Sequence, residues 1–125
     1  MANRRKHSLM ASWLTSWNGF VYAVRNERNV GIAFVFVVLA MITSAILQIS
    51  LIEWIVVVLC CGFVVTTELL NTAIEAVTDL ACNEEIHPLA KIAKDVAAGA
   101  TGAASVTSVI IAALIFGPRV IEMLF

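Results

Sequence analysis

The chain is dominated by three long hydrophobic stretches separated by short polar segments. The first stretch has no charged residue, the third has one at its start, and the second keeps most of its charges near its end. Each stretch reaches the roughly 20 residues that a helix needs to cross a hydrocarbon core about 30 Å thick. We therefore predict an all-α membrane protein with membrane-spanning helices at 30–50, 53–80 and 95–118.

A fourth helical pattern precedes the first stretch. Between residues 8 and 26, large apolar residues recur at helical spacing, and serine, threonine and asparagine fall mainly on the other side. Trp13 and Trp17 are typical of helices that lie in the headgroup zone. We predict an amphipathic surface helix at 8–26, and its simplest role is that of a peripheral anchor. Residues 1–125 then form a single membrane domain.

Composition limits where chemistry can occur. The 125 residues are 61% hydrophobic, with a mean hydropathy of +0.95, which is too apolar for an ordinary soluble domain. Three spans leave no room for a soluble catalytic domain, so any reaction must use the spans and their flanks. The net charge of -1 and the absence of a basic stripe argue against a nucleic-acid partner. The three cysteines show no CxxC spacing and are interpreted as packing residues.

The positions of the basic residues predict the orientation. Lysine and arginine close to a span are retained on the cytoplasmic side. They are concentrated before the first span, with Lys91 and Lys94 between the second and third, whereas the opposite ends carry Glu53 and Arg119. We predict that the N-terminus and the 82–95 segment face the cytoplasm.

The second span ends in a row of polar residues. Glu68, Asn71, Glu75 and Asp79 stand at relative positions 0, 3, 7 and 11. At 100° per residue they share a sector of about 80° on one helical face, so we expect them to look into the same cleft. Carboxylates within a membrane are costly and usually face a protein interior or a wet cavity, which favours a functional role. The alternative is a polar seam that holds helices together.

Depth separates the members of this row. Measured from Trp54 on the outer side, Glu68 lies about 21 Å along the helix, Glu75 about 32 Å and Asp79 about 38 Å. With a core of about 30 Å, Glu68 is predicted inside the cytoplasmic leaflet, Glu75 at its boundary and Asp79 in water. Glu68 is therefore placed to reach a membrane-embedded substrate, and Glu75 to meet a soluble anion.

Charged residues on the other helices occur at the same boundary. Glu27 immediately precedes the first span, at the predicted height of Glu75. Two carboxylates from different helices form a plausible Mg²⁺ site, because Mg²⁺ is often held by one or two carboxylates plus substrate phosphates. The ordinary alternative for Glu27 is a surface charge paired with a neighbouring arginine. Lys94 and Asp95 are also at this boundary, where Lys94 either neutralises phosphate or simply snorkels.

These positions predict phosphoryl transfer from a soluble polyphosphate to a lipid alcohol. Such a reaction needs positioning, charge neutralisation and a base near the attacking hydroxyl. We expect Glu68 to accept the hydroxyl proton and Asn71 to orient Glu68 or a phosphate oxygen. Neither GxxxxGK[ST] nor GxGxxG occurs in the chain. The alternatives are an ion or proton transporter and a non-catalytic assembly subunit, but the first span has no ionisable residue for a relay.

Three segments resemble the small prokaryotic diacylglycerol kinase family of integral membrane proteins. They are RNERN at 25–29, ELLNTAIEAVTDL at 68–80 and HPLAKIAKDVAAGA at 87–100. The tripeptide IEW at 52–54 and the HPLAK segment are more similar to the Gram-positive branch, whose members mainly phosphorylate undecaprenol. The resemblance implies a homotrimeric bundle in the bacterial inner membrane with active sites at subunit boundaries. It also implies Mg²⁺ and ATP, with undecaprenol preferred over diacylglycerol.

The resemblance implies a role for each matching residue. It gives Glu68 as the catalytic base, and Asn71 and Lys94 as catalytic contacts to substrate or phosphate. It gives Glu27 and Glu75 as metal and nucleotide ligands. The remaining candidate substrate or nucleotide contacts are Ser16, Asp79 and Asp95.

Overall fold

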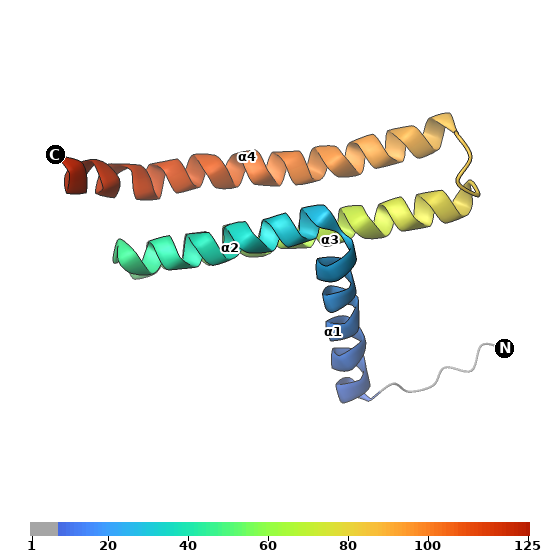
Figure 1. Cartoon of the computed structure of the whole chain (residues 1–125), viewed down its shortest axis with the longest axis horizontal. Helices are drawn as coiled ribbons and strands as arrows, with labels where there is room; N and C mark the ends of the chain where they lie inside the picture. The colour runs from blue at the N-terminus through green and yellow to red at the C-terminus, as the bar shows by residue number, and fades with distance from the viewer. Residues whose placement is uncertain (1–7) are drawn as a thin grey trace.

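The computed structural model describes residues 8–125, which form four helices and no strand. The helices are α1 (Leu9–Asn26), α2 (Arg28–Ile46), α3 (Leu51–Ala81) and α4 (Pro88–Leu124). Helices α2, α3 and α4 run alongside one another, and α1 leaves this bundle sideways where α2 begins (Figure 1). The last turns of α3 and the first turns of α4 extend past α1. Helices α2, α3 and α4 are each long and apolar enough to cross a membrane.

A single extended residue separates α1 from α2. Helix α1 begins at Ser8, whose hydroxyl oxygen accepts a hydrogen bond from the Ala11 amide at 3.2 Å. It ends at Glu27, which has φ -108° and ψ 112° and is also the N-cap of α2. The chain therefore turns from α1 into the bundle at Glu27.

The connection between α2 and α3 is tight. Helix α2 ends at Ile46, four residues before the predicted end at 50, and Gln48 adopts a left-handed φ of 49°. Ser50 then caps α3: its hydroxyl oxygen accepts from the Glu53 amide at 3.3 Å, and its own amide donates to Glu53 Oε2 at 2.8 Å. This reciprocal pair is a capping box, and it places Glu53 in the first turn of α3 rather than in a loop.

Helix α4 is longer than the predicted span at 95–118. It begins after His87, whose Nδ1 accepts from the Leu89 amide at 3.1 Å, with Pro88 in the first turn. It also continues through Pro118 to Leu124. A proline does not have to end a helix in an apolar environment, where neighbouring groups take over the freed backbone partners.

Ion pairs join α3 and α4 at both of their ends. At the start of α3, Arg119 donates to both carboxylate oxygens of Glu53, with Nη1–Oε1 at 2.7 Å and Nη2–Oε2 at 2.6 Å. At the other end, Lys94 pairs with Asp79. The two pairs hold the helices antiparallel in one register.

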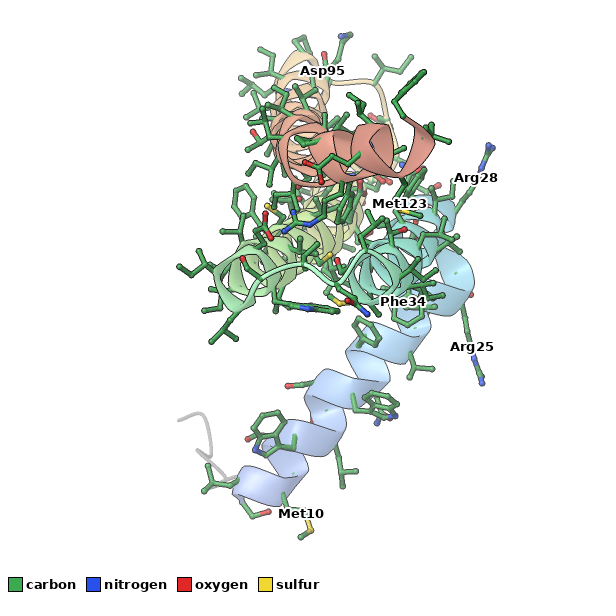
Figure 2. The ribbon with its side chains drawn as sticks, turned by 90° about the vertical axis from the view of Figure 1, so that its left-hand side faces the viewer. Met10, Arg25, Arg28, Phe34, Asp95 and Met123 are labelled. Carbon is green, nitrogen blue, oxygen red and sulfur yellow. The ribbon has the colours of Figure 1, made fainter. Side chains whose placement is uncertain are left out.

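The described helices bury few side chains in one another, and the buried apolar ones are small. Large apolar side chains such as Leu39, Leu59 and Leu114 remain exposed instead, and Met10 of α1 projects away from the bundle in Figure 2. Such a surface suits hydrocarbon and not water, which agrees with three spanning helices. The buried apolar residues are Ala23, Val30, Ala33, Ile49, Val57, Ala97 and Ala104.

Candidate active site

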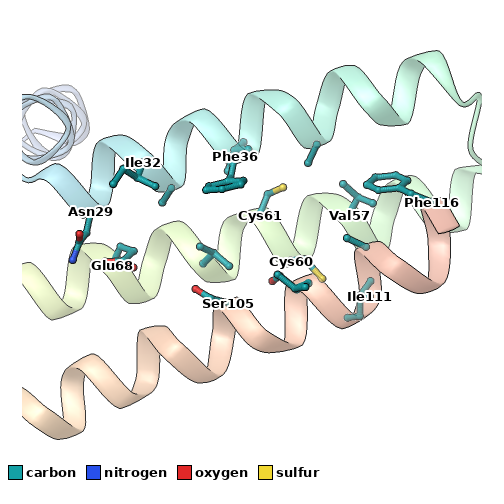
Figure 3. Close-up of a pocket in the computed structure, with 17 residues that line it drawn as sticks. Asn29, Ile32, Phe36, Val57, Cys60, Cys61, Glu68, Ser105, Ile111 and Phe116 are labelled. Atoms are coloured by element: carbon teal, nitrogen blue, oxygen red, sulfur yellow. The ribbon is translucent and has the colours of Figure 1, made fainter. Parts of the chain in front are cut away.

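An apolar pocket lies between α2, α3 and α4 (Figure 3). Its volume is about 340 Å³, and its wall is formed mainly by aliphatic and aromatic side chains such as Ile32, Phe36 and Phe116. Glu68 is part of this wall and lies towards one end of the pocket. The polar side chains in the wall are Asn29, Glu68, Ser105 and Ser108.

Asn71 and Glu75 form a second group, one turn beyond Glu68. Asn71 is 7% exposed, and its Nδ2 donates to Glu75 Oε1 at 3.3 Å. The Asn71 Oδ1 atom is buried and has no hydrogen-bond partner among residues 8–125. An unsatisfied buried acceptor costs about 1–3 kcal/mol, so this oxygen is suited to a donor from another molecule. Asn71 therefore orients Glu75 and keeps one acceptor available.

Asp79 and Lys94 form a third group, at the end of the α3–α4 pair. Their ion pair joins the two helices, while Asp95 pairs with Lys91 one turn away on the exposed side of α4. Lys94 thus places a positive charge beside the end of the acidic row. Asp95 pairs with a different lysine, and none of the ion pairs found among residues 8–125 joins it to Lys94.

Glu68 and the rest of the row on α3 have different surroundings, and the expectation that all four residues look into one cleft stays a prediction. Glu68 lines the pocket, but Asn71, Glu75 and Asp79 do not. The physical reason is depth: the pocket extends from Glu68 towards Val57, whereas the other three residues follow Glu68 in the opposite direction. Side chains on one face of a helix point in the same direction but lie at different heights along the helix axis.

Glu27 is half-buried at the junction of α1 and α2. Its side chain makes no capping hydrogen bond, and none of the three ion pairs found among residues 8–125 includes it. Arg25 and Arg28 point away from the bundle in Figure 2. The alternative that Glu27 is merely neutralised by a neighbouring arginine is therefore not what the structure has.

Metal binding would have to use a small set of ligands. Residues 8–125 contain no group of three or more histidine, cysteine or acidic side chains that could hold a metal ion. Glu27 and Glu75 each carry a carboxylate, the type of ligand that Mg²⁺ takes before completing its shell with water and substrate phosphates. Ser16 is exposed on α1, and its hydroxyl donates to the Ser12 carbonyl oxygen at 3.0 Å.

Comparison with known proteins identifies the kind of enzyme that carries this arrangement. Residues 14–116 match the family model of prokaryotic diacylglycerol kinase. The chain belongs to the prokaryotic diacylglycerol kinase family. As a member of this family it is a membrane-bound lipid kinase, and the family's chemistry implies ATP as phosphate donor. The family resemblance drawn from the three sequence segments is confirmed.

Two curated relatives of this family are similar over most of the chain. A diacylglycerol kinase from Synechocystis sp. is 38% identical over 118 residues, which cover 94% of this chain and 67% of that protein. An undecaprenol kinase from Bacillus subtilis is 40% identical over 108 residues, which cover 86% of this chain and 87% of that protein. The two relatives bear the names of different lipid substrates.

Sequence reasoning missed two features of this family member. Asn29 was not singled out, although a polar residue at the start of an otherwise apolar span was a usable signal. The Glu53–Arg119 pair was read as two separate flanking charges. Opposite charges at the start of one span and the end of the next predict such a pair once the two helices are known to be antiparallel.

Proposed function

We propose that the protein transfers the γ-phosphate of ATP to the hydroxyl group of a membrane lipid alcohol, with undecaprenol preferred over diacylglycerol. The observation that carries this proposal is Glu68, a carboxylate in the wall of an apolar pocket between membrane-spanning helices. A carboxylate at that position needs a polar partner. The hydroxyl of a lipid whose hydrocarbon chain occupies the pocket is such a partner.

Glu68 acts as the general base in this proposal. The lipid hydroxyl oxygen forms a bond to the γ-phosphorus, and the bond from that phosphorus to the β,γ-bridging oxygen breaks. ADP leaves, and the hydroxyl proton passes to Glu68. The apolar wall excludes water from the attacking position, which limits wasteful hydrolysis of ATP.

The nucleotide lies on the cytoplasmic side of Glu68. Glu27 and Glu75 would hold Mg²⁺, and the ion would supply neutralisation of charge on the phosphates. Asn71 keeps Glu75 oriented through the hydrogen bond between them. Lys94, which Asp79 positions, adds a positive charge for the phosphates. Ser16 and Asp95 are further candidate nucleotide contacts.

Two observations support the preference for undecaprenol. The relative from Bacillus subtilis is named undecaprenol kinase, and this chain covers 87% of its length. The pocket is also lined mainly by apolar side chains. Undecaprenol has one polar group, its hydroxyl, whereas diacylglycerol brings two ester groups that also need polar surroundings.

We propose further that the enzyme is a homotrimer in the bacterial inner membrane, with its N-terminus in the cytoplasm. The basic residues before and at the start of α2, together with Lys91 and Lys94 in the first turns of α4, support this orientation. Helix α1 runs across the direction of the spans (Figure 1), as a helix on the membrane surface would. The free Asn71 Oδ1 supports an active site that a neighbouring subunit helps to complete.

A direct assay tests the proposed function. The purified protein is incubated with γ-labelled ATP in mixed micelles that contain either undecaprenol or diacylglycerol, with and without Mg²⁺. We expect Mg²⁺-dependent label in the lipid fraction, with a higher kcat/KM for undecaprenol. Label in neither lipid would overturn the proposal, and a higher kcat/KM for diacylglycerol would overturn the stated preference.

A further inference from the structure

Asn29 is a polar residue in the wall of the same pocket as Glu68. It lies in the first turn of α2, and the close-up in Figure 3 shows it at the end of the pocket where Glu68 lies on α3. The wall beyond them is formed mainly by apolar side chains. The amide and the carboxylate thus come from two different helices and meet the same end of one pocket.

The Asn29 amide differs from the other asparagines near the site in having no partner. Asn26 donates from Nδ2 to the Tyr22 carbonyl oxygen at 2.8 Å, and Asn71 donates to Glu75. No hydrogen bond from or to the Asn29 side chain occurs among residues 8–125. Glu27, two residues earlier, does not line the pocket. Asn29 is therefore the amide on α2 that remains available to a ligand in the pocket.

An attacking alcohol also needs a hydrogen-bond donor, which the ionised Glu68 carboxylate lacks. A hydroxyl has one proton to donate and two lone pairs. Its proton must face the base, and one lone pair must face the phosphorus, so the second lone pair is left for a hydrogen-bond donor. An ionised carboxylate can only accept, whereas an asparagine amide carries two N–H donors.

We infer that Asn29 binds the lipid hydroxyl, donating from its amide to the hydroxyl oxygen while the hydroxyl proton faces Glu68. This inference rests on the proposed function and adds a substrate-binding residue to it. The two contacts fix the rotation of the hydroxyl group about its carbon–oxygen bond. A lone pair is then directed away from both side chains, towards the phosphate that it attacks.

Three substitutions at Asn29 separate the donor from the shape of the side chain. Asn29→Ala removes the amide, Asn29→Asp keeps the shape without the donor, and Asn29→Gln keeps the donor on a longer stem. Asn18→Ala is the matched control, because Asn18 is an exposed asparagine of α1 outside the pocket wall. The measurement is kcat and KM for undecaprenol and for ATP in mixed micelles.

We expect Asn29→Ala and Asn29→Asp each to lower kcat/KM for the lipid about tenfold, the loss associated with one hydrogen bond. The KM for ATP should stay at the wild-type value, because the inference places Asn29 on the lipid hydroxyl and not on the nucleotide. Asn29→Gln should recover part of the loss, and Asn18→Ala should behave as wild type. A general folding defect would also impair ATP binding. It would not depend on whether the side chain at position 29 carries an N–H donor.

Two results would overturn the inference. One is wild-type kcat/KM for the lipid in both Asn29→Ala and Asn29→Asp, and the other is an Asn29→Gln variant as impaired as Asn29→Asp. The Glu68→Gln variant distinguishes a failure of the role of Asn29 from a failure of the proposed function. If Glu68→Gln is inactive while Asn29→Ala is normal, the role of Asn29 fails and the proposed function stands. If the wild type labels no lipid, the proposed function itself fails.

Discussion

The two ends of the α3–α4 pair differ in how their charges are balanced. At the start of α3, Glu53 receives hydrogen bonds from Arg119 and from the Ser50 amide, so that both of its oxygens are satisfied. In the second half of α3, Lys94 neutralises Asp79, but Glu68 and Glu75 have no cation within 4.0 Å among residues 8–125. The comparison teaches that matched charges hold the helices together, whereas unmatched carboxylates remain available to ligands.

The largest expected effect comes from removing the unmatched charge in the pocket. Glu68→Gln keeps the size of the side chain but cannot accept a proton, so kcat should fall by about 10²–10⁴-fold. Lipid labelling measures the loss, and size-exclusion chromatography in detergent checks that the protein remains folded. Turnover within a few-fold of wild type would remove Glu68 from the role of base.

The next effect concerns the pair of carboxylates proposed to hold Mg²⁺. Glu75→Gln and Glu27→Gln should each raise the Mg²⁺ concentration for half-maximal activity at least about tenfold, since each removes one charged ligand. A Mg²⁺ titration at saturating lipid measures the shift. Glu85→Gln is the control, because Glu85 is an exposed acid in the segment between α3 and α4. An equal shift in all three variants would point to overall charge and contradict a specific site.

For the Glu53–Arg119 pair, we expect substitutions to change stability and not activity. Glu53→Gln and Arg119→Gln each leave a charge unmatched and should lower the midpoint of thermal unfolding by several degrees, while kcat stays near wild type. The double variant should lose less than the two single variants together, because neither charge is then left alone. Circular dichroism in detergent gives the midpoints. A kcat loss without a change in the midpoint would mean that the Glu53–Arg119 end of the helix pair takes part in catalysis.

The smallest effect is expected for the exposed pair on α4. Lys91 and Asp95 form a surface ion pair, and such pairs contribute little because solvent screens them. Lys91→Ala should leave the unfolding midpoint and kcat within experimental error. If Lys91→Ala instead impairs nucleotide binding, the exposed face of α4 belongs to the site, as was predicted for Asp95.

The helical architecture could be predicted from the sequence because long apolar stretches have few alternatives in a bilayer. Depth along a helix also separated Glu68 from Glu75, and the structure keeps them in different surroundings. The Glu53–Arg119 pair could not be predicted with the same ease, since it depends on the register of α3 against α4. Asn29 was missed because a neutral amide gives no charge signal, and its position in the pocket depends on how α2 packs against α3.

Glu27 has a consequence for the mechanics of the enzyme. It is the one extended residue between α1 and α2, and it is also the proposed metal ligand from this part of the chain. Any change in the angle between the two helices must rotate the Glu27 backbone and so displace its carboxylate. The residue at which the chain turns from α1 into α2 is therefore also a proposed Mg²⁺ ligand. A change in the angle between these helices would alter the geometry of the proposed metal site.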